Sequence, residues 1–150
     1  MDLKLEVVIL PVSDIERAKQ FYVNGLGCRE DVDVQAGDFR AVQLTPPGSA
    51  CSIIFGTGVS SSPPGSVERI LLVVDDIDKA RNELIGRGVD VGEIFHDGAG
   101  GPGAGFAPPE ARAPGLDPGR QSYASYAIFR DPDGNTFMLQ EVTERAPGRV

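Results

Sequence analysis

The sequence predicts an α+β fold made of two related halves, each a strand followed by a helix and three further strands. The first observation is an internal repeat, in which residues 8–20 and 70–82 match at a constant offset of 62 residues. Each copy is an apolar, strand-like run followed by an acidic helix start and a helical pattern. The second is a Ser-, Pro- and Gly-rich linker at 58–66. Two such halves can set their sheets side by side, with helices outside and a cleft within.

The first half, expected at about residues 3–57, contains an opening strand, a helix and three strands. Ser13 and Glu16 form a capping box that predicts the helix start, with Ser13 as the N-cap. Apolar side chains at spacings of three and four give this helix one buried face. The expected elements are a strand at 3–12, a helix that ends near Gly25, and strands at 28–34, 39–44 and 50–55.

The second half, expected at about residues 67–143, repeats this order but contains a long insertion. Asp75 is expected to cap its helix, with Asp78 reaching back to the cap. The insertion at 96–120 holds seven Gly and five Pro and cannot keep a regular helix or strand for long. It is either a lid over a pocket or a disordered surface loop. The expected strands are 67–74, 89–95, 121–130 and 135–142, with a tight turn at 131–135.

Alternation along each strand separates the residues that face the helix from those that face the cleft. Arg69 would be costly beneath a helix, so it is assigned to the cleft together with Val7, its counterpart in the repeat. In the last strand, the Phe and Leu positions suit the helix-covered face, and the positions between them face the cleft. The predicted cleft residues are Val7, Ile9, Arg69, Leu71, Met138 and Gln140.

Arg69 carries the strongest chemical signal among these residues. A cleft arginine can hold a carboxylate or a phosphate through two parallel hydrogen bonds. The alternative is a structural ion pair with Glu141, Glu68 or a partner chain. Met138 suits a pocket wall, and Gln140 can orient a polar group of a ligand.

Aromatic and titratable residues supply the remaining candidates. Tyr123 and Tyr126 would face opposite ways on a regular strand, so at most one of them enters the cleft, and Tyr126 is the candidate. His96, the single histidine, can serve as an acid or base if the insertion folds over the cleft. Otherwise it is a surface residue.

Composition excludes several classes of function. The net charge of -8 argues against nucleic-acid binding, which needs a basic surface. No apolar run approaches the roughly 20 residues of a membrane span. The opening residues lack the basic-then-apolar order of a secretion signal, so a cytoplasmic protein is expected.

These motifs together resemble a known superfamily. The strand ending at 12–14, the helix with Arg17 to Tyr22 and the turn Asp131-Pro132-Asp133-Gly134-Asn135 are similar to the glyoxalase and bleomycin-resistance superfamily, also called the vicinal oxygen chelate superfamily. The resemblance covers nearly the whole chain. It implies two βαβββ modules that form a cupped mixed sheet around one site, usually in a homodimer.

Enzymes of this superfamily hold a divalent metal in the cup. The resemblance places two histidine ligands seven residues before Asp14 and Asp76, and a glutamate three residues past Asn135. Such a metal needs three or more N, O or S donors. The residues at these positions are Val7, Arg69 and Met138. We therefore expect no metal and no cofactor.

The expected function is metal-free binding of a small molecule, with drug or metabolite sequestration as one form of it. The first alternative is a lyase or isomerase of the same superfamily, either metal-independent through Arg69 and His96 or with an atypical metal site. The second is an interaction module that keeps only the fold, because fold alone does not determine function. The expected partners are a small-molecule ligand and a second copy of the chain.

Overall fold

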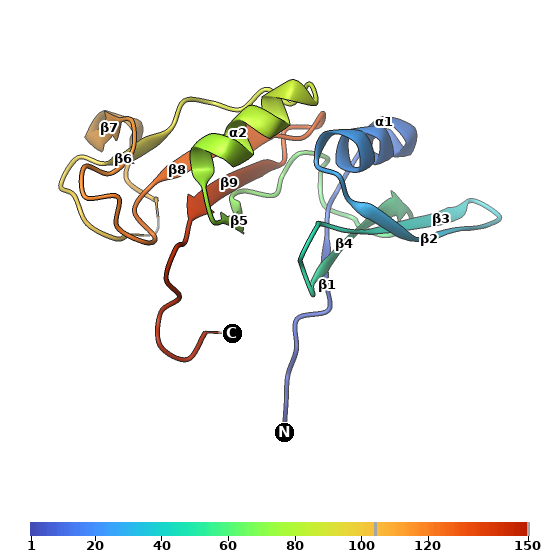
Figure 1. Cartoon of the computed structure of the whole chain (residues 1–150). Helices are drawn as coiled ribbons and strands as arrows, with labels where there is room; N and C mark the ends of the chain where they lie inside the picture. The colour runs from blue at the N-terminus through green and yellow to red at the C-terminus, as the bar shows by residue number, and fades with distance from the viewer. Residues whose placement is uncertain (104, 150) are drawn as a thin grey trace. The chain divides into compact units, whose positions relative to one another are not determined.

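The structure is a computed structural model that describes residues 1–103 and 105–149 (Figure 1). It confirms the predicted α+β class, with two mixed sheets and few helices. The chain forms two compact units, each made of separate pieces of sequence. Unit 1 contains Met1–Glu68, Arg87–Val89 and Arg130–Thr136, and unit 2 contains Arg69–Gly86, Asp90–Phe129 and Phe137–Val150. No helix in the described part of the chain is long and apolar enough to cross a membrane.

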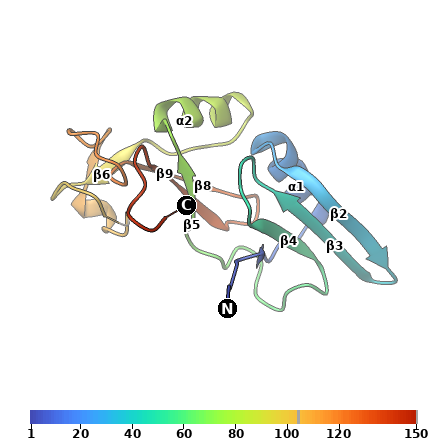
Figure 2. The same cartoon turned by 60° about the horizontal axis from the view of Figure 1, so that its bottom comes forward.

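Unit 1 has a four-stranded sheet in the order β1-β4-β3-β2. Its elements are β1 (Val7–Ile9), α1 (Ile15–Gln20), a π-helical turn (Phe21–Gly25), β2 (Arg29–Ala36), β3 (Phe39–Thr45) and β4 (Ser52–Thr57). β1 runs parallel to β4, and β3 is antiparallel to both of its neighbours. The helix lies on one side of this sheet (Figures 1 and 2), where the ring of Tyr22 packs 5.8 Å from that of Phe55. The core of unit 1 lies between the helix and the sheet.

The opening strand is shorter than the predicted range of 3–12. Ser52 begins β4 and pairs with Val7, so β4 offers no strand residue opposite the first six positions. The chain before Ser52 turns away, with the Ser49 amide donating to the Pro46 carbonyl. Leu3 and Leu5 are exposed as a result. A sequence with alternating apolar residues forms a strand only where a neighbouring strand can pair with its backbone.

Both helices are capped one residue later than predicted. Asp14, not Ser13, is the N-cap of α1 and accepts from the Arg17 amide at 3.0 Å. In the same way, the Asp76 carboxylate accepts from the Lys79 amide at 3.1 Å. Ser and Asp are comparable caps, so adjacent candidates are not separated by propensity. Ser13 is instead bound through both its amide and its hydroxyl to Asp133.

Unit 2 has a five-stranded sheet in the order β5-β9-β8-β6-β7, with β5 parallel to β9. Its elements are β5 (Ile70–Val74), α2 (Ile77–Gly86), β6 (Phe95–Asp97), a 3-10 turn (Pro109–Ala111), β7 (Arg112–Pro114), β8 (Tyr126–Arg130) and β9 (Thr136–Glu141). α2 lies on one side of β8 and β9 (Figures 1 and 2). The rings of Phe129 and Phe137 stack with centroids 5.1 Å apart.

A buried carboxylate ties the start of α2 to its sheet. Glu141, which is 0% exposed, accepts from the Ile77 amide at 2.9 Å and pairs with Arg120 through two bonds of 3.0 Å. Hydrogen bonding to Arg120 lowers the pKa of Glu141. Because alternate residues of a strand share a face, this contact also places Phe137 on the α2 side. The other residues of β9 therefore face away from the helix.

The strand predicted at 121–130 begins only at Tyr126. Tyr123 has a φ of +72°, which no strand residue adopts. The preceding chain is held in a turn, in which the Asp117 amide donates to Ser125 Oγ at 3.0 Å and the Asp117 carboxylate accepts from the Gln121 amide. The strand predicted at 89–95 is likewise displaced, and β6 occupies Phe95–Asp97. Turn chemistry overrides the apolar pattern before Tyr126, whereas in the range 89–95 Val91 forms only an isolated bridge with Phe129.

Candidate ligand-binding faces

Each sheet has one face toward its helix and a second face, here called the far face. The far face of unit 1 carries Val7, Ile9, Val32, Val34, Phe39 and Ile54, as the strand register shows. The far face of unit 2 carries Leu71, Val73, Tyr126, Ile128, Met138 and Gln140. Six of the predicted ligand-binding residues lie on these two faces: Val7, Ile9, Leu71, Tyr126, Met138 and Gln140.

The far face of unit 1 is apolar and open. Ile9 pairs with Ile54 across β1 and β4, and the apolar surface continues on β3 and β2. Ile9 is 48% exposed and Val34 51% exposed, and Phe39 at the hairpin end is also exposed. Scattered apolar side chains are ordinary on a surface, but a contiguous set on one sheet face indicates a contact surface.

The far face of unit 2 is largely covered. Tyr126 and Met138 are 0% exposed and pack with Phe95 in one cluster, whereas Leu71 on the edge strand β5 is 39% exposed. The cover comes from the glycine-rich insertion, whose residues Gly103, Gly105 and Phe106 contact this face. The insertion therefore folds back on its own sheet.

Hydrogen bonds fix the insertion to the far face of unit 2. The Gly103 amide donates to Tyr126 Oη at 3.1 Å, and Tyr126 Oη donates to the Tyr123 carbonyl at 2.7 Å. Gln140 Nε2 donates to the Gly103 carbonyl at 3.3 Å and to the Tyr123 carbonyl at 3.1 Å. Burial raises the pKa of Tyr126, so this hydroxyl stays a neutral donor and acceptor. The polar ends of Tyr126 and Gln140 are therefore already hydrogen-bonded to backbone groups.

Gly105 makes the closest approach to the sheet. A Cβ atom at this position would lie 2.7 Å from Met138 Cε and 2.9 Å from Tyr126 Cδ1. The residue also has a φ of +70°, which L residues with side chains rarely adopt. Only glycine therefore allows the backbone to lie on Met138 and Tyr126.

Arg69, which directly precedes β5, also contacts the insertion. Its Nη1 donates to the Gly105 carbonyl at 3.4 Å, and its guanidinium lies 5.2 Å from the ring centre of Phe106. Arg69 has a φ of +57°, so strand alternation, which was used to assign it to the cleft, does not apply to it. Glu141, considered as a partner for Arg69, pairs with Arg120 instead.

His96 lies elsewhere in unit 2. It pairs with Ala113 in the β6-β7 ladder, and its Nδ1 lies 2.8 Å from the Gly115 carbonyl. Its neighbour Phe95 packs on Tyr126, so alternation turns His96 to the opposite side of β6. The insertion folds over the far face without bringing this histidine to it.

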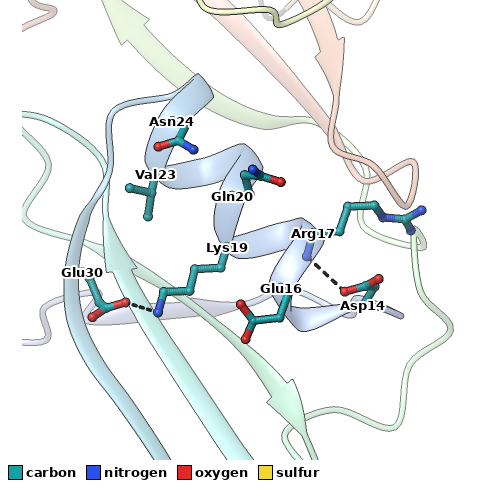
Figure 3. Close-up of a pocket in the computed structure, with 8 residues that line it drawn as sticks. All are labelled: Asp14, Glu16, Arg17, Lys19, Gln20, Val23, Asn24 and Glu30. Atoms are coloured by element: carbon teal, nitrogen blue, oxygen red, sulfur yellow. Dashed lines mark hydrogen bonds and ion pairs between the residues drawn. The ribbon is translucent and has the colours of Figure 1, made fainter.

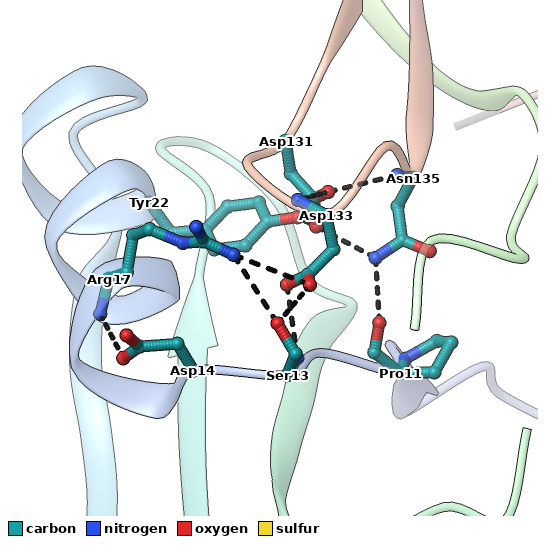
Figure 4. Close-up of polar contacts among 8 residues, drawn as sticks. All are labelled: Pro11, Ser13, Asp14, Arg17, Tyr22, Asp131, Asp133 and Asn135. Carbon is teal, nitrogen blue, oxygen red and sulfur yellow. Dashed lines mark hydrogen bonds and ion pairs between the residues drawn. The ribbon is translucent and has the colours of Figure 1, made fainter. Parts of the chain in front are cut away.

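The turn at 131–135 is a structural element of unit 1 (Figure 4). The Tyr22 hydroxyl donates to Asp131 Oδ2 at 2.7 Å, and Asn135 Nδ2 donates to the same oxygen at 2.8 Å. Asn135 Nδ2 also donates to the Pro11 carbonyl at 2.9 Å, and Asp133 holds Ser13. Burial raises the pKa of Tyr22 well above its usual range. Each of these polar groups is therefore hydrogen-bonded within unit 1.

A charged hollow lies beside α1 (Figure 3). It has a volume of about 730 Å³ and is lined by Asp14, Glu16, Arg17, Lys19, Gln20, Val23, Asn24 and Glu30. Its charges are paired: Lys19 contacts Glu30 and Asp33, and Arg40 contacts Glu16 and Asp33. These pairs hold the helix on the hairpin, and Val23 is the single apolar side chain among the lining residues.

Two strand-helix modules, each with a sheet that has one face toward its helix and a far face, define a class of paired-module α+β proteins. The chain matches the Glyoxalase/Bleomycin resistance protein/Dioxygenase superfamily over residues 4–139 and belongs to it. No curated protein sequence matches the chain.

Solved structures agree with this assignment. TnmS3, an antibiotic binding protein from Streptomyces sp. CB03234, is 29% identical, with a TM-score of 0.66 over 94% of this chain and 97% of that chain. A glyoxalase/bleomycin resistance protein from the same organism is 30% identical, with a TM-score of 0.63 over 92% of this chain and 100% of its own. A superfamily member from Sphaerobacter thermophilus DSM 20745 is 31% identical, with a TM-score of 0.64 over 93% and 98%.

The residues at the superfamily's metal positions do not fit a metal. The Val7 side chain has no metal-donor atom, and the Arg69 side chain is itself positively charged. Met138 offers only a thioether, which is packed against Tyr126 and Gly105. Among the described residues, no group of three or more His, Cys, Asp or Glu is arranged to hold a metal ion. The metal chemistry of the superfamily's enzymes cannot be transferred to these side chains.

Sequence reasoning missed the residues that cover the far face of unit 2. Gly103, Gly105 and Phe106 come from the insertion, whose composition showed only that it lacks long regular elements. The glycine content of the insertion was the available signal, and it does not indicate which surface the segment contacts.

Proposed function

We propose that this protein binds a small aromatic molecule on the far face of unit 2 without a metal ion, as a sequestration protein does. The observation that carries the proposal is the set of groups gathered around the superfamily's metal positions in unit 2. These are the Arg69 guanidinium, the Gln140 amide, the Tyr126 hydroxyl and the Met138 thioether. They recognise a ligand by shape and hydrogen bonding rather than by coordination.

Each group has a defined use toward an aromatic ligand. Met138 is apolar and adapts to a ring, and Tyr126 adds a flat contact surface. Gln140 Nε2 donates to an oxygen, and Arg69 can bind an oxygen or stack on a ring. This is the usual composition of a ligand site, a mostly apolar surface with a few placed polar groups.

The open face of unit 1 supports the same function. Val7, Ile9 and Ile54 offer apolar area without a polar requirement, and burying apolar surface contributes about 25 cal/mol per Å². Similarity to TnmS3, an antibiotic binding protein at 29% identity, also supports small-molecule binding. Sequestration needs affinity and no reaction, so no bond to the ligand is made or broken.

The test combines metal analysis with binding measurements. Purified protein is analysed for metals, and then naphthalene-2-carboxylate and naphthalen-2-ylmethylamine are titrated by calorimetry and by thermal shift. We expect no stoichiometric metal, one bound probe per chain and a rise in Tm that follows RT ln(1 + [L]/Kd). Stoichiometric metal, or no binding by either probe, would overturn the proposal.

Turnover is measured in the same samples. A metal-independent lyase or isomerase was expected to use Arg69 with His96, but His96 contacts the Gly115 carbonyl on the other side of β6. We therefore expect each probe to be recovered unchanged after prolonged incubation with equimolar protein. Conversion of a probe would contradict sequestration even if binding is observed.

A further inference from the structure

We infer that the insertion segment on either side of position 104 occupies the ligand's place on the far face of unit 2, and that a ligand binds there by displacing it. This inference rests on the proposed function, because it describes how that same face becomes available. The segment makes the contacts that the face would otherwise offer to a ligand. Its residues are Gly103, Gly105 and Phe106.

The insertion segment supplies hydrogen-bond partners to three polar groups at this face, and these partners could leave together. Gln140 Nε2 reaches the Gly103 carbonyl, Tyr126 Oη receives the Gly103 amide, and Arg69 reaches the Gly105 carbonyl. Buried polar groups are rarely left without partners. Gln140 and Tyr126 also donate to the Tyr123 carbonyl, so the segment supplies the second partner of each, and a displacing ligand must replace the bonds to Gly103.

The covering contact is close but small. Gly105 lies on Met138 and Tyr126 with no side chain of its own, and Phe106 remains 58% exposed although it stacks with Arg69. The segment thus buries little apolar area of its own against the sheet. A larger apolar ligand gains more from the same surface than the glycines do.

The segment also indicates the ligand class. It presents two carbonyl oxygens, one to Gln140 and one to Arg69, and one aromatic ring beside the guanidinium. A molecule that replaces it needs the same features, namely a flat aromatic ring system that carries acceptor oxygens. An aromatic carboxylate or an aromatic ketone has both, whereas an aromatic amine lacks the acceptors.

Displacement makes a measurable prediction for hydrogen exchange. The Gly103 amide is protected by its bond to Tyr126, so saturating naphthalene-2-carboxylate should speed exchange in peptides spanning 103–106 by about fivefold or more while slowing it in β8 and β9. A lid that closes over the ligand would instead slow exchange in both regions. Slower exchange at 103–106 with bound probe would overturn the inference.

Glycine variants separate occupancy from general loosening of the loop. Gly105→Ala places a Cβ within 2.9 Å of Met138 and Tyr126 at a φ of +70°, so it should drive the segment off the face. Gly101→Ala is the matched control, because its φ of +80° is equally strained but its Cβ meets open space. The apparent affinity rises with the fraction of chains whose face is open.

We expect Gly105→Ala to bind naphthalene-2-carboxylate about tenfold tighter than the unaltered protein, and Gly101→Ala to change affinity less than about twofold. Equal tightening by both variants, or no tightening by Gly105→Ala, would overturn the inference. If the unaltered protein and both variants all fail to bind either naphthalene probe, the proposed function fails. If all three bind equally, only the displacement fails.

Discussion

The two far faces come from the same repeated pattern, yet one is open and the other is covered. On unit 1, Ile9 and Val34 are about half exposed, whereas on unit 2 Met138 and Tyr126 are completely buried. The difference does not come from the strands, which keep the same alternation in both halves. It comes from the insertion at 96–120, which the first half lacks.

This contrast shows that a repeated framework and its site can be set by different parts of a sequence. Strand alternation decides which side chains face away from the helix, and a segment outside the repeat decides which of them meet solvent. A residue that is exposed on one face can therefore have a buried counterpart on the other. Substitutions at equivalent places measure this difference directly.

The largest difference is expected from truncating one apolar side chain on each face. Met138→Ala removes a fully buried side chain and should lower the free energy of unfolding by about 3 kcal/mol. Ile9→Ala removes one that is 48% exposed and should cost no more than about 0.5 kcal/mol. Urea denaturation of both variants measures this. Similar losses in the free energy of unfolding would contradict the difference in burial between the two faces.

The helix-covered side of unit 2 provides a control for the far face. Glu141→Gln removes a carboxylate that binds Arg120 and the Ile77 amide, which should cost about 2 kcal/mol at pH 7. Binding of naphthalene-2-carboxylate should not change, because Glu141 faces α2. Loss of binding in a folded Glu141→Gln variant would break the assignment of faces.

The cost of Glu141→Gln should depend on pH. The pKa of Glu141 is lowered by Arg120, so its contribution is present above the pKa of the unfolded carboxyl and is lost as pH falls through the folded value. Unfolding midpoints of the two proteins should therefore converge in strong acid. A constant difference from pH 7 to pH 2 would contradict this assignment.

A smaller effect is expected from the hydroxyl that binds the insertion. Tyr126→Phe keeps the ring but removes the acceptor of the Gly103 amide and one donor to the Tyr123 carbonyl, which should cost about 1 kcal/mol. Amide exchange in 103–106 should also become faster in the absence of any ligand. Unchanged exchange would show that the hydroxyl does not hold the insertion.

The smallest effect on stability is expected on the open face. Val34→Thr keeps the shape of an exposed side chain on β2 and should change stability by less than about 0.5 kcal/mol. Homodimer formation stays a prediction, and sedimentation velocity of the unaltered protein and of Val34→Thr tests it. If the unaltered protein is monomeric at all concentrations, the open apolar face is not covered by a second copy.

The sequence predicts the fold well because local signals and burial agree over most of the chain. The strand register places Met138 and Gln140 opposite the helix side, as alternation requires. The predictions fail where strand formation depends on a pairing partner, as at residues 3–6, which are not paired with a strand. Ser13 was not the cap, because Asp133, 120 residues away, binds it.

The candidate site is less predictable for the same reason. The positions on β9 follow from periodicity, but Arg69 adopts a left-handed backbone conformation that no alternation foresees. The contacts of Gly103 and Gly105 join residues far apart in the chain and depend on the path of an irregular segment. Composition can identify such a segment but cannot show which surface it touches.

The turn at 131–135 makes the two repeats inseparable as polypeptides. Its residues belong to unit 1, although most of both flanking strands belongs to unit 2. A chain ended after the linker at 58–66 would keep Tyr22 but lose Asp131, and its buried hydroxyl would have no acceptor there. The first repeat is therefore not a self-contained folding piece. A gene fragment that encodes the first repeat alone should yield protein that is degraded or aggregates, unless the remainder is supplied in trans.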